Sequence, residues 1–209
     1  MKQRKEPIVW NGILFDSQEE VYVAMWLEEL KSAKIIKYWD RKVSSIQITT
    51  GLKIGYTKET QLKTKLKQEI KAYTLLRPSE YTPDFEIQFY GAFFGNIISP
   101  PYASPSFNKD ALFFTSVYGF NGPVIIEVKP TFDQNNMERL FVLNQKFLWD
   151  KYRIFVNLVE PIELFKKTFL PSAAIPYFTY IRPPKGKKVG DYKFDWKPKT
   201  IQEFLNINN

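Results

Sequence analysis

Apolar residues recur along this chain with two different spacings, and the spacing predicts where helices and strands lie. Over residues 17–33, apolar side chains return every three or four positions, which predicts an amphipathic helix capped by Ser17. A second amphipathic helix is predicted over residues 137–152. Its expected buried stripe consists of Leu140, Leu143, Phe147 and Leu148.

Short apolar runs between and after these helices predict strands. The run 124–128 is rich in β-branched residues and is bounded on both sides by proline. Because side chains alternate across a strand, Glu127 and Lys129 should share one face with Ile125, and the apolar residues between them should occupy the other face. Further strands are expected at 35–39, 43–49, 70–76, 85–89 and 154–158, and a small hairpin around Asn11-Gly12.

The order of these elements predicts an α/β fold. The strand at 124–128, the 137–152 helix and the strand at 154–158 form a βαβ unit with parallel strands. One domain is expected over residues 1–170, with insertions at about 51–68 and 90–121. A proline- and lysine-rich extension, 171–209, should pack on the core or bind a partner. Within it we expect an edge strand at 177–181 and a short helix at 200–205.

Composition narrows the chemistry that this chain can perform. It contains neither cysteine nor histidine, which excludes thiolate and histidine metal sites, Ser-His and Cys-His catalysis and a histidine base. Hydrolysis would have to use carboxylates, lysines, hydroxyls and a metal ion. The lack of cysteine and of an apolar run of roughly 18 residues predicts a cytoplasmic protein without a membrane segment. A net charge of +8 favours polyanionic partners.

Two carboxylates come from segments that can meet. Asp84 directly precedes the strand at 85–89, and Glu127 lies within the strand at 124–128. If these strands pair, the two carboxylates approach each other, and they repel unless a cation lies between them. Oxygen ligands completed by water suit Mg²⁺ or Mn²⁺.

Pro83-Asp84 followed by Glu127-Val128-Lys129 resembles the motif of the PD-(D/E)XK nuclease superfamily. With its Tyr-Thr-Pro-Asp-Phe segment at 81–85, the chain is most similar to phage Holliday-junction resolvases of the endonuclease I type and to related small phage and transposon endonucleases. The resemblance covers about residues 15–159. It implies a restriction-endonuclease-like core made of a helix, a mixed β-sheet, a helix and a strand, with the β-rich insertion at 90–121 as a departure.

The resemblance implies DNA hydrolysis that depends on Mg²⁺ or Mn²⁺. The implied catalytic residues are Glu20, Asp84, Glu127 and Lys129. The implied metal ligands are Asp84, Glu127, Glu20 and the carbonyl of Val128. Glu20 matches the glutamate that the family places on its first helix, and Glu19 is the fallback. A structural interpretation of Glu20, as capping-box partner of Ser17, stays open.

Two insertions offer candidate DNA contacts. The insertion at 51–68 is either a solvated loop or hairpin, or a flap that contacts phosphates through Lys53, Lys58, Lys63, Lys65 and Lys67. On the second helix, the candidates for phosphate binding or water positioning are Arg139, Gln145 and Lys146. The aromatic insertion at 90–121 is either a β-extension with its own small core or a stacking surface for unpaired bases.

Together these features predict a Mg²⁺-dependent DNA endonuclease, either selective for branched DNA or acting in phage recombination or genome processing. The alternative is a non-catalytic, basic DNA-binding or virion-associated protein on a nuclease-like fold, and an RNA target is a third option. DNA is the expected partner, with a homodimer or other phage proteins as further partners. If the protein is phage-encoded, the host cytoplasm is its expected location.

Overall fold

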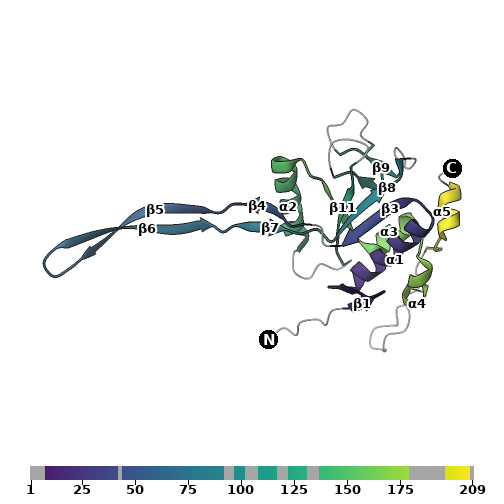
Figure 1. Cartoon of the computed structure of the whole chain (residues 1–209), viewed down its shortest axis with the longest axis horizontal. Helices are drawn as coiled ribbons and strands as arrows, with labels where there is room; N and C mark the ends of the chain where they lie inside the picture. The colour runs from purple at the N-terminus through teal and green to yellow at the C-terminus, as the bar shows by residue number, and fades with distance from the viewer. Residues whose placement is uncertain are drawn as a thin grey trace.

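A four-stranded mixed sheet forms the centre of the computed structural model, which describes residues 8–41, 44–91, 97–101, 108–116, 122–130, 137–178 and 196–207 (Figure 1). Its strands lie in the order β12 (Val156–Val159), β11 (Val124–Val128), β8 (Phe85–Phe89) and β3 (Ile36–Arg41). β8 is antiparallel to both of its neighbours, whereas β11 and β12 are parallel. The predicted α/β class and the parallel βαβ unit are therefore confirmed.

Helices cover both faces of this sheet. α1 (Gln18–Ser32) and α3 (Pro161–Lys167) share one apolar core with Val124, Ile126 and Val128 of β11. α2 (Met137–Tyr152) packs on the opposite face, where Ile125 lies. The two faces predicted for β11 are thus confirmed, and Glu127 lies on the α2 side.

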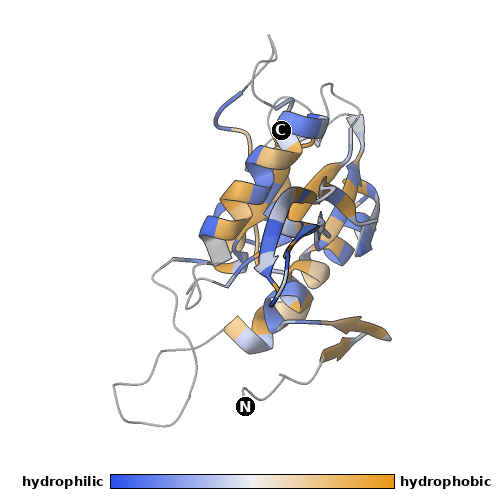
Figure 2. Ribbon diagram, turned by 90° about the vertical axis from the view of Figure 1, so that its left-hand side faces the viewer, coloured by the Kyte–Doolittle hydropathy of each residue, from blue (hydrophilic) through white to orange (hydrophobic). Residues whose placement is uncertain are grey.

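The first helix begins as its sequence predicts. The Ser17 hydroxyl accepts the backbone N–H of Glu20, and the Glu20 side chain accepts the Ser17 hydroxyl in return. Before this helix, β1 (Ile8–Trp10) and β2 (Ile13–Phe15) form the expected hairpin. Asn11 and Gly12 both have positive φ, at 48° and 76°, as a two-residue turn of type I′ requires. The hairpin is visibly hydrophobic in Figure 2.

The predicted buried stripe of α2 is largely wrong. Leu140, Leu143 and Phe147 are 45–49% exposed, and among the side chains of this helix whose burial is described, Phe141 and Leu148 are buried. Two apolar stripes run side by side along α2, and spacing alone does not choose between them. Two side-chain contacts of α2 orient the helix: the Gln145 amide donates to the carbonyl of Val156, and the Tyr152 hydroxyl donates to the carbonyl of Gln47. These contacts turn the stripe of Phe141 and Leu148 toward the sheet.

The lysine-rich insertion and the strand after it form one long hairpin. β5 (Leu52–Gln61) pairs antiparallel with β6 (Leu66–Leu76), and Figure 1 shows this hairpin projecting far from the body. The insertion is therefore longer than the 51–68 predicted. β4 (Ile46–Thr49) was expected to enter the central sheet, but it pairs instead with β7 (Ser79–Tyr81) at the base of the hairpin.

The described part of the 90–121 insertion joins the main core instead of forming its own. β9 (Ile98–Ser99) and β10 (Phe113–Phe114) pair in parallel, and Ile98 and Phe113 are buried in the α1-side core. The buried side chain of Asn157 binds both backbone groups of Phe114, at 2.8 Å each. Most of the aromatic residues proposed to stack on bases lie outside the described residues.

The C-terminal segment contributes short helices. A 3₁₀ turn (Ser172–Ala174) leads into α4 (Ile175–Phe178), so Tyr177 and Phe178 are helical and not part of the expected strand. The expected last helix is confirmed as α5 (Ile201–Ile207). Phe178 and Phe204 are buried in the same core as α1, and the lysines at 185–188 lie outside the described residues. None of the helices in the described part of the chain has the length and apolar character needed to cross a bilayer.

Candidate active site

The pairing of β8 with β11 brings Asp84 next to the end of β11. The Asp84 backbone N–H donates to the carbonyl of Ile126 at 3.2 Å, and its Oδ2 accepts the backbone N–H of Val128 at 2.7 Å. The backbone and the side chain of Asp84 are therefore each hydrogen-bonded to β11, at positions two residues apart. This placement follows from the antiparallel register, in which Phe85 lies opposite Ile126.

Glu127 is buried and is held by two donors. The Tyr81 hydroxyl donates to Oε2 at 2.8 Å, and the Lys129 ammonium forms a close ion pair with Oε1. The side chains of Glu127 and Lys129 are 12% and 18% exposed, so the pair is shielded but reachable from solvent. A carboxylate has about four lone-pair sites, so each oxygen of Glu127 retains capacity for another partner.

Asp84 and Tyr81 both have raised pKa values beside Glu127. Burial and the nearby Glu127 carboxylate raise the pKa of Asp84 from 3.8 to about 7, although the Val128 N–H and the Lys129 ammonium oppose the rise. Burial and Glu127 also raise the pKa of Tyr81 far above its ordinary value. The Tyr81 phenol is therefore protonated and acts as a hydrogen-bond donor.

Glu20 is buried, at 6% exposed, and faces inward as predicted. Its Oε2 accepts the Arg41 guanidinium at 2.7 Å, and its Oε1 accepts the Ser17 hydroxyl at 3.2 Å. Arg41 also reaches Asp16 at 3.3 Å and lies over the ring of Phe15. Both the capping role and a charged pairing are thus present at this side chain.

The site contains two adjacent carboxylates, with Glu20 as a charged neighbour. Glu20 contributes to raising the pKa of Asp84, which places its charge within electrostatic reach. No three acidic side chains of the described residues form a group that could hold a metal ion. α1 carries Glu20 on one face of the sheet, whereas Glu127 projects from the other face, so the three groups approach from different layers.

The pair of Asp84 and Glu127 fits a hard divalent cation. Burial and the neighbouring Glu127 carboxylate disfavour the charged form of Asp84, and a cation between the two side chains would remove that repulsion. Mg²⁺ is commonly bound by one or two carboxylates, with water and substrate oxygens completing its coordination. The residues present could therefore hold Mg²⁺ or Mn²⁺ through oxygen atoms alone.

The other predicted site residues lie elsewhere. Arg139 and Lys146 are exposed on α2, and the Gln145 amide donates to the carbonyl of Val156 in β12, which makes it part of the packing between helix and sheet. Five of the candidates are exposed along the β5–β6 hairpin and its turn: Lys53, Lys58, Lys63, Lys65 and Lys67.

Sequence reasoning missed the roles of Tyr81 and Arg41. Tyr81 precedes the Pro83-Asp84 pair by two residues, and this closeness to the motif was the available signal. Arg41 is the last residue of β3 and lies opposite Phe85, the residue that follows Asp84. Nothing in the local pattern indicates that it pairs with a glutamate twenty-one positions earlier, because this contact depends on the packing of α1 on β3.

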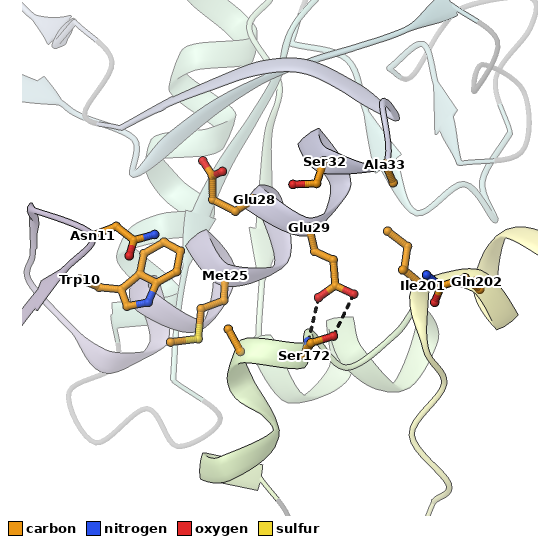
Figure 3. A pocket seen from close by; sticks show the side chains of 11 residues that line it. Trp10, Asn11, Met25, Glu28, Glu29, Ser32, Ala33, Ser172, Ile201 and Gln202 are labelled. Carbon is orange, nitrogen blue, oxygen red and sulfur yellow. Dashed lines mark hydrogen bonds between the residues drawn. The ribbon is translucent and has the colours of Figure 1, made fainter.

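A pocket drawn in Figure 3 has none of these carboxylates among its lining residues. It has a volume of about 520 Å³ and lies between the N-terminal hairpin, α1 and the C-terminal helices. Its two glutamates are already engaged: Glu29 accepts the Ser172 backbone N–H at 2.7 Å, and Glu28 accepts the Trp39 indole at 2.8 Å. These contacts identify a packing seam between α1 and its neighbours.

No protein-family model matches this chain, and neither a curated protein nor a solved structure matches it.

Proposed function

We propose that this protein is a Mg²⁺- or Mn²⁺-dependent DNA endonuclease with a restriction-endonuclease-like core. The observation that carries the proposal is the convergence of Asp84, Glu127 and Lys129 at the end of two paired strands. Together with the net charge of +8, this arrangement supports a phosphodiester as the substrate. A PD-(D/E)XK nuclease of the phage junction-resolving kind remains the family that the motif resembles.

The order of the elements supports the same proposal. α1, the antiparallel strands β3, β8 and β11, then α2 and the parallel strand β12 follow the helix, sheet, helix and strand order that the resemblance implies. The carboxylates lie on the two strands that the motif requires. A homodimer and other phage proteins are proposed partners besides DNA, and action on branched DNA is the proposed selectivity.

In the proposed reaction, each residue has a distinct task. A Mg²⁺ ion bound by Asp84, Glu127 and the Val128 carbonyl would polarise the scissile phosphate and supply a water of lowered pKa. Tyr81 holds Glu127 in place through its hydroxyl. Lys129 presents an ammonium beside the carboxylates, where it can orient the attacking water or offset negative charge on the phosphate.

Glu20 acts on the site without binding the ion directly. Because Arg41 already occupies its Oε2, Glu20 in this arrangement orients water or modulates Asp84 electrostatically. Direct binding of the ion through Oε2 would draw this oxygen away from Arg41. The Arg41 guanidinium would then be available to a phosphate, for which its planar set of donors is well suited.

Cleavage assays with purified protein test this proposal. Linear, single-stranded, flapped and four-way DNA are incubated with Mg²⁺ or Mn²⁺, beside the Asp84→Ala and Lys129→Ala variants. We expect metal-dependent cleavage that falls about 100-fold or more in either variant while DNA binding survives. Asp150→Ala, an exposed change on α2, is the matched control and should cleave normally.

Salt-sensitive binding without cleavage under either metal would refute the endonuclease and favour the non-catalytic, basic DNA-binding or virion-associated alternative. Cleavage of RNA in preference to every DNA would correct the substrate class. Normal cleavage by Asp84→Ala would place the chemistry elsewhere in the molecule.

A further inference from the structure

The projecting hairpin carries a large share of the protein's charge. We define the arm as residues 53–74, the paired part of β5 and β6 beyond the bulge at the base, with their turn. It holds six lysines and two glutamates, a net charge of +4, which is half of the chain's +8. The positive charge is thus concentrated on an element that extends away from the body (Figure 1).

The two faces of the arm differ in charge. Residues paired across an antiparallel ladder share a face, so the register assigns every side chain. The basic face contains Ile54, Tyr56, Lys58, Thr60, Lys67, Glu69, Lys71 and Tyr73. The neutral face contains Lys53, Gly55, Thr57, Glu59, Gln61, Leu66, Gln68, Ile70, Ala72 and Thr74. The whole net charge therefore lies on the basic face and on Lys63 and Lys65 in the turn.

The basic face presents cations and aromatic rings to solvent. Tyr56 and Tyr73 are 48% and 60% exposed. Glu69 pairs with Lys67 and with Lys71, the latter at 3.5 Å, and all three side chains are at least 36% exposed. Surface ion pairs of this kind contribute little and exchange readily for another anion. A two-stranded hairpin without a core is only marginally stable alone in water, which favours a partner along its length.

The base of the arm is fastened to the proposed active site. β4 and β7 pair beneath the arm, and Tyr152 of α2 donates to the carbonyl of Gln47 at 2.6 Å. Tyr81, the last residue of β7, holds Glu127. The base of the arm therefore lies next to the two carboxylates.

We propose that the arm lies along duplex DNA on one side of the scissile bond, with its basic face in a groove. This inference rests on the proposed function for the presence of DNA at the carboxylates. The ten residues of β5 span roughly 33 Å, long enough to pass several phosphates of a duplex, which lie about 3.4 Å apart along the axis on each strand. The major groove admits a two-stranded β-ribbon, whose lysines can reach the phosphates on either side.

Charge favours DNA over a second copy of this chain as the occupant. The rest of the chain also carries a net charge of +4, so a second copy would repel the arm on average. Phosphates instead pair with the lysines and release counterions. The rings of Tyr56 and Tyr73 can then cover deoxyribose or base edges near the base of the arm.

Binding in EDTA tests the arm separately from any cleavage. The arm variant combines Lys58→Gln, Lys67→Gln and Lys71→Gln, and its control combines Lys31→Gln, Lys34→Gln and Lys166→Gln, three exposed lysines of the body. The dissociation constant is measured against salt concentration, on duplexes of about 12 and about 24 base pairs, roughly one and two turns. A charge-preserving triple change to arginine at the three arm positions should bind like the wild type.

We expect the arm variant to bind the longer duplex about tenfold or more weakly, and its log–log salt slope to fall by about 2.7, at about 0.9 for each lost phosphate contact. The wild type should prefer the longer duplex, and the arm variant should lose that preference. The inference is overturned if arm and body variants weaken binding equally. It is also overturned if the arm variant binds DNA normally but no longer forms a dimer that the wild type forms, since the arm would then bind a second copy.

These results separate the two proposals. Arm-dependent binding of duplex DNA without cleavage of any substrate would support the contact between the arm and the duplex and refute the endonuclease. If the arm variant cleaves DNA with metal and binds DNA as the wild type does, the endonuclease is supported and this inference is refuted.

Discussion

Replacing Asp84 with asparagine should make the protein more stable at pH 8. The Asp84 carboxyl lies half-buried beside Glu127, and this environment disfavours its charged form. Asparagine removes the charge, and its amide oxygen can still accept the backbone N–H of Val128 that Oδ2 now accepts. If this site binds a cation at the expense of stability, removing the charge of Asp84 should stabilise the fold.

The size and sign of the effect follow from the pKa shift. In the folded state the pKa of Asp84 is about 7, against 3.8 for an ordinary aspartate, so the folded protein binds the proton more tightly. The free energy of unfolding of the wild type therefore falls as the pH rises from about 4 to about 7. At 1.36 kcal/mol for each pKa unit, the full shift corresponds to at most about 4 kcal/mol, and partial hydration reduces the expected gain of Asp84→Asn to about 1–3 kcal/mol at pH 8.

Urea unfolding in EDTA at pH 5, 6, 7 and 8 measures this difference, with Asp150→Asn as an exposed control. The gain of Asp84→Asn should be small at pH 5 and increase toward pH 8. Adding Mg²⁺ at ten times its dissociation constant should stabilise the wild type by about 1.4 kcal/mol and leave Asp84→Asn unchanged. The reasoning is refuted if Asp84→Asn is no more stable than the wild type at pH 8, or if its advantage does not change with pH.

Three further changes test other parts of the structure. Glu20→Gln breaks the buried ion pair with Arg41 and should lower the free energy of unfolding by about 3 kcal/mol. Glu19→Gln should change it by less than about 0.5 kcal/mol. Equal losses would contradict the pairing of Glu20 with Arg41. Tyr81→Phe removes the hydroxyl that donates to the buried Glu127 carboxylate and should lower the free energy of unfolding by about 1.5–3 kcal/mol, measured by urea unfolding. No loss would mean that this hydrogen bond is not formed. On α2, Leu148→Ala should lower the free energy of unfolding by about 2–5 kcal/mol, and Leu143→Ala should lower it by less than about 1 kcal/mol. The reverse order would mean that the stripe predicted from spacing is the buried one.

Local signals were sufficient for the elements whose determinants lie close together in the chain. The Ser17 cap, the Asn11-Gly12 turn and the alternating faces of β11 are each encoded within a few residues, and the structure reproduces them. The approach of Asp84 to Glu127 was also predictable, because it needs only that two strands pair. For the same reason, the α/β class follows from the order of the elements.

Tertiary packing decided the features that local patterns leave open. α2 offers two apolar stripes, and the chain buries the one that lets Gln145 bind β12 and Tyr152 bind β4. Glu20 lies on the inward face that its helix predicts, but its partner, Arg41, comes from β3 and pairs with its Oε2. The sequence by itself determined the two long helices, the central strands and the meeting of two carboxylates, since these depend on short-range stereochemistry and strand alternation. Only the packing of layers, in which groups distant in the chain compete for the same neighbours, decided how the third carboxylate is bound and where the lysine-rich arm points.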